Sequence, residues 1–239
     1  MALVDLDGLT PRDRDIFRMM AEFGGRTFNE VLERTYWHGK KVPLQQARDR
    51  ITKIKSKYRL IRLVSTGLMK PRNAIAFTDF GKRYILDETD IEVGNFFLSP
   101  VTVNHSIAEM ITWYWIRKSG RLDVSRTIVK NWSLEHKHTP DLLYFHNEDQ
   151  TKPIYVEIEL NAKSTKRYLE IFNKCDLDKV HAIFYVFSNE KKMRQLGRKL
   201  PINDKIHITN IDDLIINVST KNKIGALKQI DFIKKYEGK

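Results

Sequence analysis

The stretch TPDLLYFHNEDQTKPIYVEIELNAKS, residues 139–164, contains the pattern that decides the fold of the second half of the chain. In it, Tyr155, Glu157 and Glu159 alternate with aliphatic residues. Because successive side chains of a β-strand point to opposite faces, this alternation predicts a half-buried strand with both glutamates on one face. The run therefore predicts a sheet strand that presents two carboxylates together.

Two carboxylates side by side on a half-buried strand repel each other, and burial makes their charge more costly. A divalent cation or a shared proton relieves this repulsion, and Mg²⁺ and Mn²⁺ prefer oxygen ligands of this type. Asp141 follows Pro140 at the start of the preceding strand and adds a third carboxylate. We therefore expect Asp141, Glu157 and Glu159 to form a Mg²⁺ or Mn²⁺ site. The alternative is an exposed sheet face on which alternating glutamates pair with nearby lysines.

Helices and further strands are expected on both sides of this strand. Asn104 predicts the start of a helix in which His105 and Glu109, four residues apart, share one face. Another helix is expected over residues 164–176, followed by a strongly apolar strand over residues 182–187. A strand that leads through a helix into an apolar strand is typical of a mixed sheet with helices packed on it.

The first ninety residues predict helices followed by a hairpin. Thr10 and Pro11 provide a hydroxyl N-cap and a proline at the first helical position, and Gly24 and Gly25 end that helix. A second, short helix follows, and a third is expected within PLQQARDRITKIKSKYRLI, residues 43–61.

The third helix is expected to have two chemically different faces. One face is an apolar stripe formed by Ala47, Ile51, Ile54 and Tyr58. The opposite face carries amides, guanidiniums and ammoniums, which are the groups that contact base edges and phosphates. Its residues are Gln45, Gln46, Arg48, Arg50, Lys53 and Lys57.

A two-stranded wing is expected after this helix, from residues 60–65 and 74–78 around a turn. Lys70 and Arg72 lie at its tip, where a wing can contact the phosphate backbone. The whole run resembles the winged helix-turn-helix family over roughly the first ninety residues. That resemblance implies binding to double-stranded DNA. The alternatives are a winged helix that binds proteins and a basic face that is only solvated.

Charge and composition agree with a nucleic-acid partner. The 239 residues carry a formal net charge of +12, which attracts polyanions. Cys175 is the single cysteine, so no internal disulfide can form. The N-terminus lacks the apolar segment of a secretory signal, and the longest apolar run, residues 107–116, is too short to span a bilayer. We therefore expect a cytoplasmic protein without membrane insertion.

Pro140–Asp141, followed at a suitable distance by Glu157 and Glu159, resembles the motif of the PD-(D/E)XK nucleases. The resemblance covers roughly residues 104–210 and implies a restriction-endonuclease-like fold. In that family the aspartate and the first glutamate hold a metal ion that activates water and stabilises charge on the phosphate.

The chain departs from the family pattern where the family has a lysine two residues after the first glutamate. Glu159 occupies that position. Either the role of the lysine has moved, with Lys163 and Lys166 as the nearest candidates, or the site is no longer catalytic.

The order of the motifs narrows the resemblance. A winged helix is followed by NH-x-x-x-E, PD, E-x-E and a basic, tyrosine-containing helix, which is similar to the replication-relaxation proteins of plasmids and the MOBC-class mobilization relaxases. Such proteins nick one DNA strand at a plasmid's transfer origin. The resemblance implies a metal site of Asp141, Glu157 and Glu159, an assisting lysine, and an accessory mobilization protein and a coupling protein as partners. His105 and Glu109 either support this metal site or form a capped helix end with a solvated glutamate.

Two other chemistries are disfavoured. His136 and His138 resemble the metal-binding histidine pair of tyrosine relaxases, but Lys137 stands where that motif needs an apolar residue, so we expect a surface pair. Tyrosines in strands and helices usually pack their rings, and we expect this of Tyr144, Tyr155 and Tyr168. Cys175 is expected to be a small buried apolar group.

The predicted organisation is α+β, with a winged-helix domain over residues 1–90, a linker over 91–103 and a nuclease-like domain over 104–239 that ends in a basic helix. The preferred function is a metal-dependent DNA-nicking relaxase. One alternative is a non-catalytic plasmid replication or transcription regulator that binds DNA through the winged helix. Another is a restriction or repair endonuclease.

Overall fold

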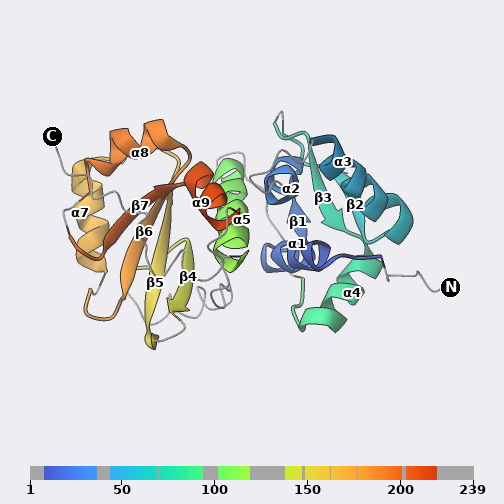
Figure 1. The fold of residues 1–239 in the computed structure, drawn as a ribbon, viewed down its shortest axis with the longest axis horizontal. Coiled ribbons are helices and arrows are strands. Elements are labelled where there is room, and N and C mark those ends of the chain that lie inside the picture. The colour runs from blue at the N-terminus through green and yellow to red at the C-terminus, as the bar shows by residue number, and fades with distance from the viewer. Residues whose placement is uncertain are drawn as a thin grey trace. The chain divides into compact units, whose positions relative to one another are not determined.

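The computed structural model describes residues 8–36, 44–68, 70–93, 102–118, 138–146, 149–161, 163–175, 177–200 and 203–219. They combine helices with two β-sheets, one of them mixed, so the fold is α+β (Figure 1). The chain divides into two units, Met1–Tyr114 and Trp115–Lys239. Most of the predicted linker and all of the predicted C-terminal helix lie outside the described residues. No helix in the described stretches is both long and apolar enough to cross a membrane.

Helix α1 (Pro11–Glu22) begins where the sequence predicts. The Thr10 hydroxyl accepts a hydrogen bond from the Asp13 amide at 3.3 Å, and the Asp13 carboxylate accepts one from the Thr10 amide at 2.6 Å. This reciprocal capping box satisfies two amides that a helix start otherwise leaves unpaired. The helix ends before Gly24 and Gly25, which adopt the left-handed φ values of 75° and 78° that favour glycine.

Two further helices follow in the first unit. They are α2 (Asn29–Tyr36) and α3 (Leu44–Lys53), and α3 continues into a π-helical segment over Ile54–Tyr58. Arg59, with a φ of 54°, ends this segment. Three of the four residues of the predicted apolar stripe are buried, namely Ala47, Ile54 and Tyr58. The fourth, Ile51, is half-buried.

The first unit also contains a three-stranded antiparallel sheet. Its strands are β1 (Arg26–Thr27), β2 (Ile61–Ser65) and β3 (Asn73–Phe77), in the order β1-β3-β2. The sequence predicts the hairpin of β2 and β3 but not β1, because two residues are too few to show alternation. In the hairpin loop, the Thr66 hydroxyl donates to the Pro71 carbonyl at 2.5 Å, which helps to order the loop.

Two helices follow the hairpin, α4 (Asp79–Thr89) and α5 (Val103–Lys118). The Thr78 hydroxyl caps α4 by accepting a hydrogen bond from an amide of its first turn at 3.0 Å. The division between the two units falls inside α5. The predicted cap of α5 is wrong, because the Thr102 carbonyl accepts the first helical hydrogen bond at 2.8 Å and Asn104 already lies in the first turn.

The second unit is built on a four-stranded sheet in the order β4-β5-β6-β7 (Figure 1). Its strands are β4 (Leu142–His146), β5 (Asp149–Glu159), β6 (Ala182–Phe187) and β7 (Ile206–Asn210). β4 runs antiparallel to β5, whereas β5, β6 and β7 are parallel, so the predicted mixed sheet with helices is confirmed. The helices are α7 (Thr165–Lys174), α8 (Glu190–Gly197) and α9 (Ile211–Ser219).

Helices α7 and α8 pack on one face of this sheet. The core between these helices and the sheet includes Leu143, Tyr155, Tyr168, Tyr185 and Leu196. Val156 and Ile158 point to the opposite face of β5 and are also buried, with exposed fractions of 0% and 2%. The prediction of a half-buried β5 is therefore wrong. Strands of parallel sheets are usually covered on both faces, so the two glutamates of β5 lie on a buried face rather than on an exposed one.

Candidate functional site

Asp141 lies immediately before β4 and binds the backbone of β5. Leu142, the first residue of β4, pairs with Val156, and the Asp141 carboxylate continues this ladder by accepting a hydrogen bond from the Ile158 amide at 2.7 Å. Ile158 lies between the two glutamates of β5 in the sequence. The negative charge of Asp141 raises the pKa values of both glutamates, after the larger effect of burial. The structure therefore places Asp141 beside the strand that carries both glutamates.

Glu157 is a buried carboxylate, and His138 is its close polar partner among the described residues. Its Oε1 atom lies 2.6 Å from His138 Nε2, and its side chain is 7% exposed. Burial raises the pKa of Glu157, the hydrogen bond from His138 opposes that rise, and the charge of Asp141 adds to it. The net direction is upward, so the surroundings do not fully compensate the charge of the carboxylate.

Glu159 is also buried, with an exposed fraction of 1%, and has two polar partners in the part of the chain that the structure describes. The Lys163 ammonium forms an ion pair with its Oε1 atom, and the Tyr168 hydroxyl donates to its Oε2 atom at 3.4 Å. Burial nevertheless raises the pKa of Glu159, against the opposing effect of Lys163. Two neighbouring buried acids therefore both resist ionisation.

Of the two lysines predicted near the site, only Lys163 contacts a site carboxylate. Lys163 precedes Ser164, whose hydroxyl caps α7 by accepting a hydrogen bond from the Arg167 amide at 3.2 Å. Lys166 is exposed on the first turn of α7. Lys163 thus contacts Glu159 from the residues just before α7, whereas Lys166 on the helix is exposed to solvent.

The prediction that His138 is a surface residue is wrong. Its side chain is 13% exposed and contacts Glu157 directly. The reason is the antiparallel pairing of β4 with β5, which brings the residues before β4 beside the C-terminal part of β5. The signal that could have revealed it is the short spacing to Pro140–Asp141, since a residue three positions before a site aspartate must lie near the same strand end. His136 and Lys137 lie outside the described residues.

Three further polar side chains are buried on the same face of the sheet. Burial and the charge of Glu159 raise the pKa of Tyr168 to about 12, and burial and the charge of Glu157 raise the pKa of Cys175 to about 12. Tyr185 pairs with Glu157 in the register of β5 and β6. Its hydroxyl is buried and has no hydrogen-bond partner within the described part of the chain.

The predicted packing of the tyrosines and the cysteine is confirmed. Tyr144, Tyr155 and Tyr168 are at most 2% exposed, and Cys175 is buried. A phenol or thiol whose pKa is raised is a poor nucleophile near neutral pH, because little of it is ionised. These phenols and this thiol are therefore poor candidates for a nucleophile.

The three carboxylates have oxygen donors of the kind that hard divalent cations prefer. Asp141, Glu157 and Glu159 offer oxygen donors at one end of β4 and β5, and the pKa values of the two glutamates are raised by burial. A bound cation stabilises the charged form of each carboxylate and so opposes that rise. His138 adds an imidazole nitrogen, and Lys163 adds an ammonium, to the same group of side chains.

In the first unit, five of the six predicted polar residues of α3 and its extension are exposed. They are Gln45, Gln46, Arg48, Lys53 and Lys57. Two of them have local partners, since Gln45 donates to Asp49 at 2.8 Å and Arg48 pairs with Glu33 at 3.3 Å. Lys70 and Arg72 are exposed in the β2–β3 loop, as predicted. Sequence reasoning missed three more exposed basic residues beside this face, Lys55, Arg59 and Arg62.

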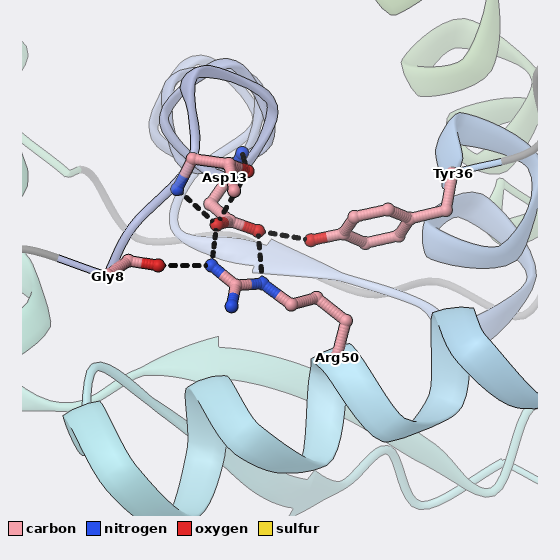
Figure 2. A network of polar contacts seen from close by, with 5 residues as sticks. Gly8, Asp13, Tyr36 and Arg50 are labelled. Atoms are coloured by element: carbon pink, nitrogen blue, oxygen red, sulfur yellow. Dashed lines mark hydrogen bonds and ion pairs between the residues drawn. The ribbon is translucent and has the colours of Figure 1, made fainter.

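Arg50 is the exception, and its predicted place on the exposed face is wrong. Figure 2 shows its guanidinium turned inward to Asp13, with which it forms an ion pair. It also donates to the Gly8 carbonyl at 2.7 Å, and its side chain is 19% exposed. Asp13 is buried in α1 and also accepts a hydrogen bond from the Tyr36 hydroxyl at 2.6 Å. A buried carboxylate requires a cationic partner, and Arg50 at the edge of the apolar stripe supplies it.

His105 and Glu109 form a pair within α5. His105 Nε2 lies 3.6 Å from Glu109 Oε1, and the Glu109 side chain is 7% exposed. Both residues fall in the first unit, where α5 packs its Trp113 edge-on against Phe23. Their predicted role in supporting a metal site stays a prediction, but Glu109 is not the solvated glutamate of the alternative.

Comparisons of the chain with models of protein families, with curated proteins and with solved structures found no match.

Proposed function

We propose that this protein is a metal-dependent endonuclease that nicks DNA bound by its first unit. One observation carries the proposal: Asp141 is bonded to the β5 backbone between two buried glutamates whose pKa values are raised. Buried acids with raised pKa values are typical of functional sites, because a protein rarely retains such groups for stability alone.

Mg²⁺ or Mn²⁺ would be held by Asp141, Glu157 and Glu159. When bound, such an ion activates water and stabilises the developing charge on a phosphate. Lys163 would support cleavage through its ammonium, because it contacts Glu159 and can balance negative charge at the site. This assignment agrees with the idea that the role of the family lysine has moved from the position of Glu159 to Lys163.

The second unit supports a PD-(D/E)XK-like fold through its mixed sheet and its motif order. The Pro140–Asp141 pair precedes β4, and the two glutamates end the neighbouring antiparallel strand. The motif order also favours the more specific proposal of a relaxase that nicks one strand at a plasmid transfer origin in the cytoplasm. An accessory mobilization protein and a coupling protein are the partners that this proposal implies.

The first unit supports DNA binding through a winged helix. Three helices precede the β2–β3 hairpin, and exposed basic residues gather on α3, on its π-helical extension and in the hairpin loop. Such residues contribute phosphate contacts whose strength falls steeply with salt. We expect Gln45 and Gln46, at the start of α3, to contact base edges.

The proposal is tested by incubating supercoiled plasmid that carries a transfer origin with the protein and Mg²⁺, Mn²⁺ or EDTA. Open circles should form only with a metal ion. Asp141→Asn and Glu157→Gln should each reduce nicking by more than the about 10- to 100-fold typical of losing a group that supports a metal site. Glu170→Gln is the matched control, because it makes the same chemical change on the exposed face of α7.

One observation favours a second candidate, a DNA-binding regulator without catalysis. Both glutamates already have partners in His138 and Lys163, so the cluster can persist without a metal ion. The regulator would leave the plasmid supercoiled with every metal ion yet still bind DNA. A restriction or repair endonuclease would instead cut both strands or show no preference for the transfer origin.

A further inference from the structure

We propose that His138 is a ligand of the same metal site, and that its nitrogen makes the site prefer a divalent transition-metal ion such as Mn²⁺ over Mg²⁺. This inference rests on the proposed metal-dependent function and names the class of ion that the site would take. It assigns His138 a direct role that the carboxylate motif by itself does not contain.

The geometry places a nitrogen donor against a site carboxylate. His138 Nε2 lies 2.6 Å from Glu157 Oε1, and both side chains are largely buried. Donor atoms that share one metal ion lie close together, because each bonds the ion at about 2.0–2.2 Å. In the chain without metal, these two atoms share a proton in a hydrogen bond. A cation can replace that proton, because the two donor atoms already lie side by side.

A second observation also indicates a ligand here. Tyr185 pairs with Glu157 in the parallel register of β5 and β6, so the two side chains point to the same face of the sheet. Tyr185 is 0% exposed, and its hydroxyl has no hydrogen-bond partner among the described residues. Buried hydroxyls are normally hydrogen-bonded. A ligand bound beside Glu157 would give this hydroxyl a partner.

The donor set determines which ion is preferred. Mg²⁺ binds oxygen almost exclusively and keeps most of its water, so an imidazole nitrogen adds little to its binding. Transition-metal ions accept imidazole together with carboxylates. A site that contains His138 beside Glu157 should therefore bind Mn²⁺ more tightly than Mg²⁺, and the difference should depend on the histidine.

The first test measures binding of each ion to the full chain in the absence of DNA. Mn²⁺ is titrated against the wild type, and Mg²⁺ is added as a competitor. In His138→Gln the ratio of Mn²⁺ to Mg²⁺ affinity should fall by about tenfold or more. The control is His181→Gln. His181 is exposed and immediately precedes β6, at the end opposite Phe187, which pairs with Glu159.

The second test detects the nitrogen directly. Pulsed electron paramagnetic resonance of Mn²⁺ bound to the wild type should show modulation from a histidine nitrogen. The modulation should persist in His181→Gln and disappear in His138→Gln and in His138→Asn. The wild-type measurement does not depend on whether either variant folds.

The outcomes separate this inference from the proposed function. Mn²⁺ bound without nitrogen modulation, or with modulation that persists in both His138 variants, overturns the role of His138 and leaves the metal-dependent function standing. A wild-type chain that binds neither Mn²⁺ nor Mg²⁺ overturns both.

Discussion

Asp13 in the first unit and Glu157 in the second are both buried carboxylates, but their surroundings shift their pKa values in opposite directions. Burial by itself would raise the pKa of Asp13, but hydrogen bonds from Arg50, Tyr36 and Thr10 outweigh it and lower the pKa. Glu157 is held by His138, whose hydrogen bond is too weak to offset burial, and its pKa is raised.

The difference lies in how completely each carboxylate is surrounded by donors. Asp13 accepts hydrogen bonds from the Thr10 amide at 2.6 Å, the Thr10 hydroxyl at 2.8 Å and the Tyr36 hydroxyl at 2.6 Å, in addition to its ion pair with Arg50. A carboxylate satisfied in this way has no further need of a ligand and serves to join α1, α2 and α3. An incompletely satisfied one such as Glu157 is suited to binding a cation.

The largest expected effect concerns the network of hydrogen bonds and the ion pair around Asp13. Arg50→Met keeps the alkyl chain but leaves Asp13 buried without its cation, so the free energy of unfolding should fall by about 3 kcal/mol or more. Arg48→Met on the same helix is the control, because Arg48 forms an exposed ion pair with Glu33 that contributes about 0–1 kcal/mol. Urea denaturation of both variants measures the difference. Equal losses would mean that the Asp13 network is not a structural centre.

The next effect concerns metal binding at Glu157. Mn²⁺ at about 100 times its dissociation constant should stabilise the wild type by about 2.7 kcal/mol through mass action. Glu157→Gln should abolish this stabilisation, whereas Arg50→Met should retain it although the variant is less stable. Thermal denaturation with and without Mn²⁺ tests the prediction. Stabilisation of the Glu157 variant by Mn²⁺ would place the metal ion elsewhere.

A third prediction concerns the pH dependence of the Asp13 network. The pKa of Asp13 lies below its ordinary value of 3.8, so the unfolded chain binds more protons than the native chain between the two values, and stability rises with pH there. The advantage of the wild type over Asp13→Asn, about 2 kcal/mol for a charged hydrogen-bonded group, should be complete above that ordinary value. It should shrink as pH falls through the native pKa. A difference that does not change between pH 6 and pH 3 would contradict the assignment.

The smallest effect compares two buried tyrosines of the second unit. Tyr168→Phe removes a hydroxyl that donates to Glu159 and should lower the free energy of unfolding by about 1 kcal/mol. Tyr185→Phe removes a hydroxyl that has no partner among the described residues, so it should leave the stability of the metal-free chain unchanged or raise it slightly. Chemical denaturation without metal measures both. A larger loss for Tyr185→Phe would mean that its hydroxyl has a partner.

Local sequence patterns predicted the elements that depend on local physics. The capping signal at Thr10 and Pro11 placed the start of α1 correctly, because a cap is formed by residues three positions apart. The alternation around Glu157 placed both glutamates on one face of β5, because a strand has a period of two residues. The same reasoning did not reveal β1, which exists only through its pairing with β3.

The wrong predictions for Arg50 and His138 concern partners distant in the sequence. Arg50 lies 37 residues from Asp13, and His138 lies 19 residues from Glu157. Helical periodicity assigns Arg50 only an approximate direction, and a long side chain at the edge of an apolar stripe can turn inward when a buried acid lies opposite. For His138, the contact with Glu157 depends on the antiparallel pairing of β4 with β5, and the sequence does not specify how closely the two strand ends approach.

The sequence by itself determined the α+β class, the mixed sheet, the shared face of Glu157 and Glu159, and the basic character of α3. These follow from periodicity, capping and charge, which act over a few neighbouring residues. Only the tertiary structure decided that β5 is buried on both faces and that Asp141 binds the backbone between the glutamates. It also decided that several donors lower the pKa of Asp13, whereas the described surroundings of Glu157 leave its pKa raised. Burial and donor number depend on what packs against a side chain from elsewhere in the chain, and these two quantities set the charge that a carboxylate can hold.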